Sequence, residues 1–178
     1  MHINKSSFDN IKTYINNKMI TFKIRRMKTI TYSFYIILLD QVSKFLVLSI
    51  FGYERSKNII PYLLNFTPVK NKGAAFSLFS ESTNILTIIS IIVSIILITI
   101  ILKYPPKSFW NLLGLAYLLG GTIGNGIDRL FRGYVLDFLE LVPINFPIFN
   151  LADVSINIAI VFFLIDIIKT TERTRLNH

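Results

Sequence analysis

One stretch of the chain constrains its fold more than any other: residues 82–102 are 21 amino acids without a charge, dense in isoleucine. An α-helix rises about 1.5 Å per residue and the hydrocarbon core of a bilayer is about 30 Å thick, so roughly 20 apolar residues cross it. Isoleucine favours strands in water, but an open strand in lipid would leave its backbone groups without hydrogen-bond partners. The sequence therefore predicts a membrane protein with a transmembrane helix here.

Three more segments have the length and composition of transmembrane helices. Residues 108–127 are uncharged, residues 29–53 are apolar apart from a short polar group, and residues 151–168 carry an aspartate near each end. The two longer connections hold prolines and β-forming residues, which predicts small strands and turns there. We therefore expect a mostly α-helical membrane protein with four transmembrane helices, at about 29–53, 82–102, 108–127 and 151–168.

The distribution of Lys and Arg predicts the orientation of these helices. The chain has 19 such residues against 10 Asp and Glu, a net charge of +9 that in a soluble protein would suggest nucleic acid. Here twelve of them lie in residues 1–28, the 103–107 turn and the tail after residue 168, while six lie in the two longer connections. Because cytoplasmic loops carry the excess of positive charge, both termini are expected in the cytoplasm and no nucleic-acid partner is expected.

Composition also divides the chain into three parts. Residues 1–26 are polar and basic, and they are predicted to form a cytoplasmic extension before a second possible start at Met27. Residues 27–170 hold the four predicted spans and form the membrane domain, and residues 171–178 form a cytoplasmic tail. The extension is expected to be dispensable for chemistry at the opposite membrane face.

The residue types that are missing exclude several kinds of enzyme. The chain has no cysteine, and its two histidines are His2 and His178, one near each end. Thiol nucleophiles, Ser-His triads and histidine-based metal sites are therefore excluded, and neither a metal nor a cofactor is expected. Ser43 and Lys44 make a poor serine–lysine dyad, because adjacent helical residues point about 100° apart. Hydrolytic chemistry would have to rely on carboxylates.

A polar pair interrupts the first predicted span. Asp40 and Lys44 are four residues apart, on one face of a helix, and Asp40 lies about 16 Å into the span, roughly mid-membrane. Charges at this depth are costly and usually functional. A buried structural ion pair, or an anchor to another helix, is favoured over a direct part in chemistry.

Small and polar residues gather at the outer end of the third predicted span. Gly120 and Gly124 have the spacing that lets two helices approach closely. Asn125, Asp128 and Arg129 follow; Asp128 is expected to pair with Arg129, which could instead hold another polar group. A helix cap at the interface would explain the last two residues but not Asn125, which lies one turn deeper.

Two further acids are predicted at the same outer level. Asp137 stands in an apolar setting just outside the membrane, and Asp153 falls in the first turn of the fourth span, for which Asn150 is a candidate N-cap. Capping alone would explain Asp153. Two carboxyl groups near one low-dielectric site, however, share a proton, and an aspartic protease needs such a pair. One carboxylate takes a proton from water while the other protonates the peptide.

Five blocks in this order resemble the bacterial lipoprotein signal peptidase family, also called signal peptidase II. The blocks are Asp40-Gln41-x-x-Lys44, Asn71-x-Gly73-Ala74-Ala75-Phe76, Gly120-Gly121-x-x-Gly124-Asn125-x-x-Asp128-Arg129, Val135-x-Asp137-Phe138 and Phe149-Asn150-x-Ala152-Asp153. Each block alone is modest evidence, but their order and their places within four spans are specific. The resemblance covers roughly residues 29–168.

The resemblance implies an aspartic endopeptidase of the inner membrane, with Asp137 and Asp153 as catalytic dyad and the active site at the outer face. It implies a prolipoprotein substrate whose cysteine already carries diacylglycerol, cut immediately before that cysteine. Membrane lipid is the other partner expected, and no oligomer is implied. An extracytoplasmic β-cradle and a short surface helix would lie within 54–80 and 130–150. The substrate-binding or supporting positions that it matches are Asn71, Gly121, Asn125, Arg129, Asn150 and Ala152, beside the structural pair Asp40 and Lys44.

Two alternatives remain open at this point. A small transporter or assembly factor would also carry polar residues inside its spans, but its acids would be spread through the depth of the bilayer rather than gathered at one interface. An intramembrane protease with a Gly-x-Gly-Asp motif is disfavoured, because the segment from Gly124 to Asp128 is one residue too long.

Overall fold

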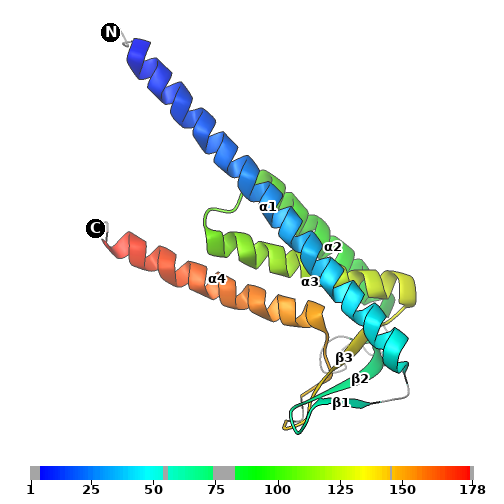
Figure 1. Cartoon of the computed structure of the whole chain (residues 1–178). Helices are drawn as coiled ribbons and strands as arrows, with labels where there is room; N and C mark the ends of the chain where they lie inside the picture. The colour runs from blue at the N-terminus through cyan, green and yellow to red at the C-terminus, as the bar shows by residue number, and fades with distance from the viewer. Residues whose placement is uncertain (1–4, 54–55, 74–82, 145, 177–178) are drawn as a thin grey trace.

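The computed structural model describes residues 5–53, 56–73, 83–144 and 146–176. Within them the chain forms four α-helices and one small antiparallel sheet (Figure 1). The elements are α1 (Lys5–Phe51), β1 (Lys57–Ile60), β2 (Leu64–Asn71), α2 (Thr83–Lys103), α3 (Phe109–Arg132), β3 (Val135–Leu141) and α4 (Leu151–Leu176). The predicted mostly α-helical chain, with short strands in its longer connections, is confirmed.

Three of these helices are long and apolar enough to cross a membrane: α2, α4 and the part of α1 from Lys12 to Phe51. Their isoleucine and leucine side chains are widely exposed, as expected of helices that contact lipid. The third predicted span, now α3, is not among them, because glycines and polar residues in its second half make it less apolar. Instead, α3 packs against each of the other three helices.

Small residues let α3 lie close to its neighbours. A Cβ atom at Gly120 would lie 2.7 Å from the Cβ of Ile36 in α1, and one at Gly121 would lie 2.5 Å from the carbonyl oxygen of Ala152 in α4. Real Cβ atoms do not approach other atoms this closely, so only glycine fits at these crossings. The close helix approach predicted from the glycine spacing is present, and it brings polar residues of α3 against both α1 and α4.

A tight turn links α3 to β3. Gly133 has a φ of 72°, a left-handed conformation that glycine adopts without steric cost, and its N–H donates to the carbonyl oxygen of Arg129. The N–H of Leu136 then donates to Oδ2 of Asp128 at 3.1 Å. The turn therefore positions β3, and with it Asp137, beside the end of α3.

The sheet has the strand order β1-β2-β3, and both strand pairs are antiparallel. Val69 of β2 lies opposite Asp137 of β3. Phe66 packs edge-on against Phe138, with ring centroids 5.5 Å apart, and against Phe51 at the end of α1, with centroids 6.0 Å apart. These aromatic contacts hold the sheet against the end of α1. The sheet lies within the two ranges, 54–80 and 130–150, in which a small β-cradle is predicted.

The short surface helix implied by the family resemblance has no counterpart in the described residues. It is expected within 54–80 and 130–150, and the described parts of these ranges form strands, turns and the end of α3. Residues 74–82, which include the last three residues of the second motif, lie outside the described part of the chain.

The two ends of the chain lie at one end of the molecule, and the sheet lies at the other (Figure 1). Because α1 is one helix of 47 residues, residues 5–26 continue the first predicted span without a break. Arg25 donates from Nη1 to the carbonyl oxygen of Pro106 at 3.0 Å, and to that of Lys107. The basic extension is thereby tied to the turn between α2 and α3.

Candidate active site

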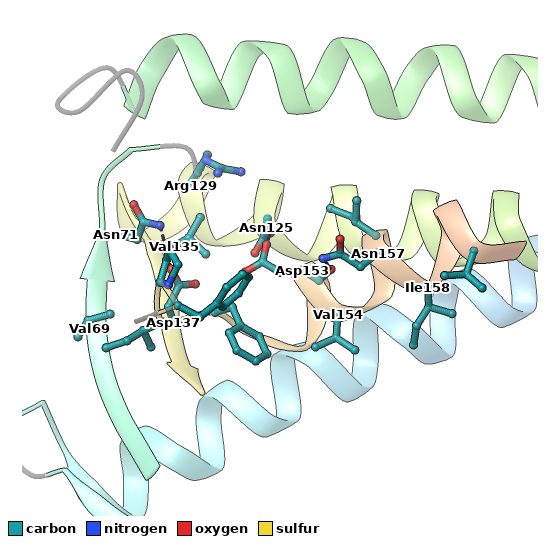
Figure 2. Close-up of a pocket in the computed structure, with 16 residues that line it drawn as sticks. Val69, Asn71, Asn125, Arg129, Val135, Asp137, Asp153, Val154, Asn157 and Ile158 are labelled. Carbon is teal, nitrogen blue, oxygen red and sulfur yellow. Dashed lines mark hydrogen bonds between the residues drawn. The ribbon is translucent and has the colours of Figure 1, made fainter. Parts of the chain in front are cut away.

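Two aspartates from different elements line one pocket of about 910 Å³ (Figure 2). Asp137 projects from β3 and is 2% exposed, whereas Asp153 lies in the first turn of α4 and is partly exposed. The two acids that the sequence predicts at one level therefore meet in one site. The rest of the lining is Val69, Asn71, Asn125, Arg129, Val135, Phe146, Pro147, Ile148, Phe149, Val154, Ile156, Asn157, Ile158 and Val161.

Asn150 joins the two aspartates. Its backbone N–H donates to Oδ2 of Asp153 at 3.1 Å, and its side-chain Nδ2 donates to Oδ1 of Asp137 at 2.6 Å. Its Oδ1 accepts from the backbone N–H of Asp153 at 2.9 Å, which caps the start of α4. The N-cap predicted for Asn150 is therefore present, and the same residue sets how the two carboxyl groups lie relative to each other.

Two more asparagines orient the acids, one from α3 and one from β2. Asn125 donates from Nδ2 to Oδ1 of Asp153 at 2.8 Å, and its own Oδ1 accepts from Nδ2 of Asn150 at 3.0 Å. Asn71 donates from Nδ2 to Oδ2 of Asp137 at 2.8 Å. Each of the four carboxylate oxygens thus has a donor, and three of these donors are asparagine side chains.

Burial, and after it the charge of Asp153, raises the pKa of the Asp137 carboxyl to about 7. The hydrogen bonds from Asn71 and Asn150 favour the ionised form and oppose this shift. Near neutral pH, Asp137 therefore holds a proton about half of the time while it lies beside the more exposed Asp153. Two carboxyl groups in this state can hold one proton between them.

A buried cluster of charges adjoins the pocket. Lys44 of α1 is fully buried, and its Nζ lies 2.8 Å from Oδ2 of Asp40 and 2.9 Å from Oδ2 of Asp128. The same nitrogen donates to Oδ1 of Asn125 at 3.2 Å. Oδ1 of Asp40 accepts from the backbone N–H of Ala152 at 2.9 Å. The predicted pair exists, but as part of a three-charge cluster that connects α1 with α3 and α4.

One prediction about these charges is wrong. Asp128 does not pair with Arg129; it is fully buried, and its ion-pair partners are Lys44 and, at 3.7 Å, Nε of Arg132. Adjacent residues of a helix point in different directions, so Asp128 faces α1 while Arg129 lines the pocket. Asp40 does anchor α1 to another helix, as expected, since its carboxylate binds the backbone of α4 just before Asp153.

The remaining predicted residues line or shape the same pocket. Arg129 lines it and donates from Nη1 to Oγ of Ser90 in α2 at 3.4 Å. Gly121 and the fully buried Ala152 form a close contact between α3 and the start of α4, which carries Asp153. The catalytic, supporting and structural residues predicted from the sequence therefore lie in this site or pack against it, whereas Ala74, Ala75 and Phe76 of the second motif lie outside the described residues.

Three polar residues of the site were not assigned a role from the sequence. Ser90 contacts Arg129, Asn157 lines the pocket, and Gln41 donates from Nε2 to the carbonyl oxygen of Gly124 at 3.1 Å. A search for lone polar side chains inside apolar stretches would have found Ser90 and Asn157. Among the described residues, no three His, Asp or Glu side chains are arranged to hold a metal ion.

The family of the chain follows from a match over residues 32–169 to the family model described as Signal peptidase (SPase) II. The chain belongs to the Signal peptidase II family. The matched range includes both aspartates of the pocket and the whole buried charge cluster. The resemblance recognised in the five sequence motifs is thereby confirmed.

Relatives in the Signal peptidase II family are similar over most of their length. A protein named lipoprotein signal peptidase from Parasynechococcus marenigrum (strain WH8102) is 42% identical over 152 residues, which are 85% of this chain and 96% of that protein. One of the same name from Enterococcus faecalis (strain ATCC 700802 / V583) is 39% identical over 130 residues, 73% of this chain and 81% of that protein.

The fold is also similar to that of solved structures. A structure described as a bacterial membrane enzyme is 31% identical, has a TM-score of 0.74, and matches 82% of this chain and 90% of that one. A second one has a TM-score of 0.71 at 31% identity, and the match covers 79% of this chain and 92% of that one. Together with the apolar helices, membership of the Signal peptidase II family makes this chain a membrane peptidase.

Proposed function

We propose that this member of the Signal peptidase II family is an aspartic endopeptidase that removes the signal peptide from diacylglyceryl-modified prolipoproteins, cutting just before the lipidated cysteine. Family membership supports the reaction class and a prolipoprotein substrate. The observation that carries the catalytic assignment is the meeting of Asp137 and Asp153 in one pocket, linked through Asn150. No metal or organic cofactor has a part in this reaction.

In the proposed reaction, Asp153 is ionised and takes a proton from a water molecule, whose oxygen attacks the scissile carbonyl carbon. Asp137 is protonated and gives its proton to the carbonyl oxygen. When the C–N bond of the tetrahedral intermediate breaks, the cysteine nitrogen takes the proton held by Asp153. A hydroxyl proton of the intermediate returns to Asp137, so the pair ends with one proton, as it began.

The other polar residues are proposed to hold this pair in place and to bind substrate. Asn71 and Asn150 fix the Asp137 carboxyl, and Asn125 fixes that of Asp153. Arg129 lies on the pocket wall, where its charge can attract the polar backbone of the substrate. The buried cluster is proposed to stabilise the site. Asp40 and Lys44 join α1 to α3, which carries Asn125 and Arg129, and to α4, which carries Asp153.

The pocket wall supports a substrate that enters sideways from the membrane. Apolar residues that follow Asp153 along α4 line the pocket, among them Val154, Ile158 and Val161. A signal peptide and the acyl chains of a lipidated cysteine are apolar, and both would reach this wall without leaving lipid. Membrane lipid is therefore a second proposed partner, and the proposed reaction requires only one copy of the chain.

We further propose that α3 is a fourth span and that the active site lies at the outer face of the inner membrane. With 24 residues, α3 is about 36 Å long at the usual helical rise, enough to cross the hydrocarbon core. Twelve of the 19 Lys and Arg lie in residues 1–28, the 103–107 turn and the tail after residue 168, which supports a cytoplasmic location for the end of the molecule that holds these segments. Residues 1–26 and 171–178 are then cytoplasmic, and 27–170 form the membrane domain.

The test is cleavage by the purified protein in detergent, without an ion gradient. The substrate is a synthetic peptide across a lipobox, with diacylglyceryl on its cysteine, and products are identified by mass spectrometry. We expect cleavage before the cysteine, a much slower reaction when the cysteine is unmodified, and no effect of a metal chelator. Failure to cleave the lipidated peptide would favour a transporter or assembly factor.

A further inference from the structure

Asn157 is a polar residue of the pocket that the proposed reaction does not use. It lies on α4 one helical turn after Asp153, is exposed, and lines the pocket beside that acid (Figure 2). Its Nδ2 donates to the backbone carbonyl oxygen of Asp153 at 2.9 Å. Its Oδ1 accepts no hydrogen bond from any of the described residues.

The other polar side chains in the apolar part of α4 have partners. Ser155 is buried and donates to the carbonyl oxygen of Leu151, and Asp166 accepts from the hydroxyl of Ser108. In hydrocarbon, a polar group without a partner costs free energy, and such groups usually mark a functional site. Because Asn157 lines a pocket and its oxygen has no partner among the described residues, its position indicates a ligand that donates a hydrogen bond.

The proposed substrate has donors of this kind. A signal peptide in the membrane is helical, so its backbone N–H groups are satisfied within the helix. Attack on a peptide bond requires access to its carbonyl, and unwinding the helix near that bond leaves N–H groups without acceptors. An acceptor on the pocket wall would replace the hydrogen bond that is lost.

We propose that Oδ1 of Asn157 accepts a hydrogen bond from a backbone N–H of the signal peptide, about two residues before the cleavage site. One helical turn along α4 from Asp153 is about 5.4 Å, and an extended peptide advances about 3.3 Å per residue. Asn157 is thus a substrate-binding residue that stabilises the unwound segment of the peptide just before the cleavage site. This inference rests on the proposed function.

The test combines one protein variant with backbone-ester substrates. An ester in place of one amide removes a single N–H, and Asn157→Leu removes the acceptor with little change in size. For the all-amide lipidated peptide, Asn157→Leu should lower kcat/KM by about tenfold. An ester at the interacting residue should lower kcat/KM of the unmodified protein by a similar factor, yet have no further effect on Asn157→Leu.

Ser155→Ala is the matched control, because it removes a polar side chain of the same helix that does not line the pocket. It should show the same ester effects as the unmodified protein. Thermal unfolding should show that all three proteins are equally folded. An unchanged kcat/KM for Asn157→Leu, or additive ester effects at each of the three residues before the cleavage site, would overturn the inference. If the unmodified protein failed to cleave the all-amide peptide, the proposed function itself would be wrong.

Discussion

At the scale of single residues, Asp137 sets the pH dependence of the proposed reaction. Its pKa is raised to about 7, by burial first and then by the charge of Asp153, and it must hold a proton to protonate the substrate. As the pH rises through 7 this proton is lost, so kcat/KM should fall by about tenfold per pH unit well above 7. Measuring kcat/KM with the lipidated peptide from pH 5 to 9 checks this, and a flat profile from pH 6 to 9 would contradict it.

Lys44 gives a second prediction at this scale. Lys44→Met leaves Asp40 buried without a cation and leaves Asp128 with Arg132 alone, at 3.7 Å, which should cost about 3–5 kcal/mol of folding free energy. Were only a pair present, adding Asp40→Asn would remove the unpaired charge. In the observed cluster, Asp128 would stay buried with only the longer contact to Arg132, so the triple variant that also carries Asp128→Asn should recover more stability than the double variant. The stabilities are compared by thermal unfolding in detergent. Equal stability of the double and triple variants would show that Asp128 does not interact with Lys44.

At the scale of elements, the close approach of α3 to α4 holds Asp153 in place. A methyl group at Gly121 would lie 2.5 Å from the carbonyl oxygen of Ala152, so Gly121→Ala must move α4 away. We expect a loss of about 1–3 kcal/mol in stability and a clear fall in kcat. Gly126→Ala is the control on the same helix, because its nearest neighbour would be Ser90 Cβ at 3.3 Å. Equal behaviour of the two variants would show that the helix approach does not matter.

The positions of the helices and part of the site could be predicted from the sequence, because they depend on residues that are close together in the chain. The i, i+4 spacing of Asp40 and Lys44 and the capping of α4 by Asn150 depend on a few neighbouring residues. The partner of Asp128 could not be predicted, because it depends on how α1 packs against α3. For the same reason, the sequence could not show that Asp40 reaches the start of α4.

The helices differ in how well composition predicts them. α2 is uniformly apolar, and its bounds, Thr83–Lys103, lie within one residue of the predicted 82–102. α3 runs five residues past the predicted end at 127, because Asp128, Arg129 and Arg132 find partners there without leaving the helix. Polar residues at a helix end mark the end of an apolar stretch, but not the end of the helix.

At the scale of the whole molecule, the basic extension lies at the end opposite the sheet (Figure 1). A chain that starts at Met27 should therefore insert correctly and cleave lipidated peptide with nearly unchanged kcat/KM. It should unfold at a slightly lower temperature, because Arg25 and its bonds to Pro106 and Lys107 are lost. Arg25→Ala in the full chain should reproduce that shift. If the chain that starts at Met27 reached the membrane in normal amount and with normal topology but lost activity, the extension would have a role in the reaction.

The central claim is that the whole fold serves to bring Asp137 and Asp153 together as a catalytic pair. The most direct measurement is the cleavage rate of the lipidated peptide by purified Asp137→Asn and Asp153→Asn. Asp166→Asn is the control, since this acid lies on α4 but bonds to Ser108, away from the pocket. We predict that each dyad variant folds normally yet loses activity by at least about a thousandfold, while the control cleaves at the normal rate. Near-normal cleavage by either dyad variant would contradict the account.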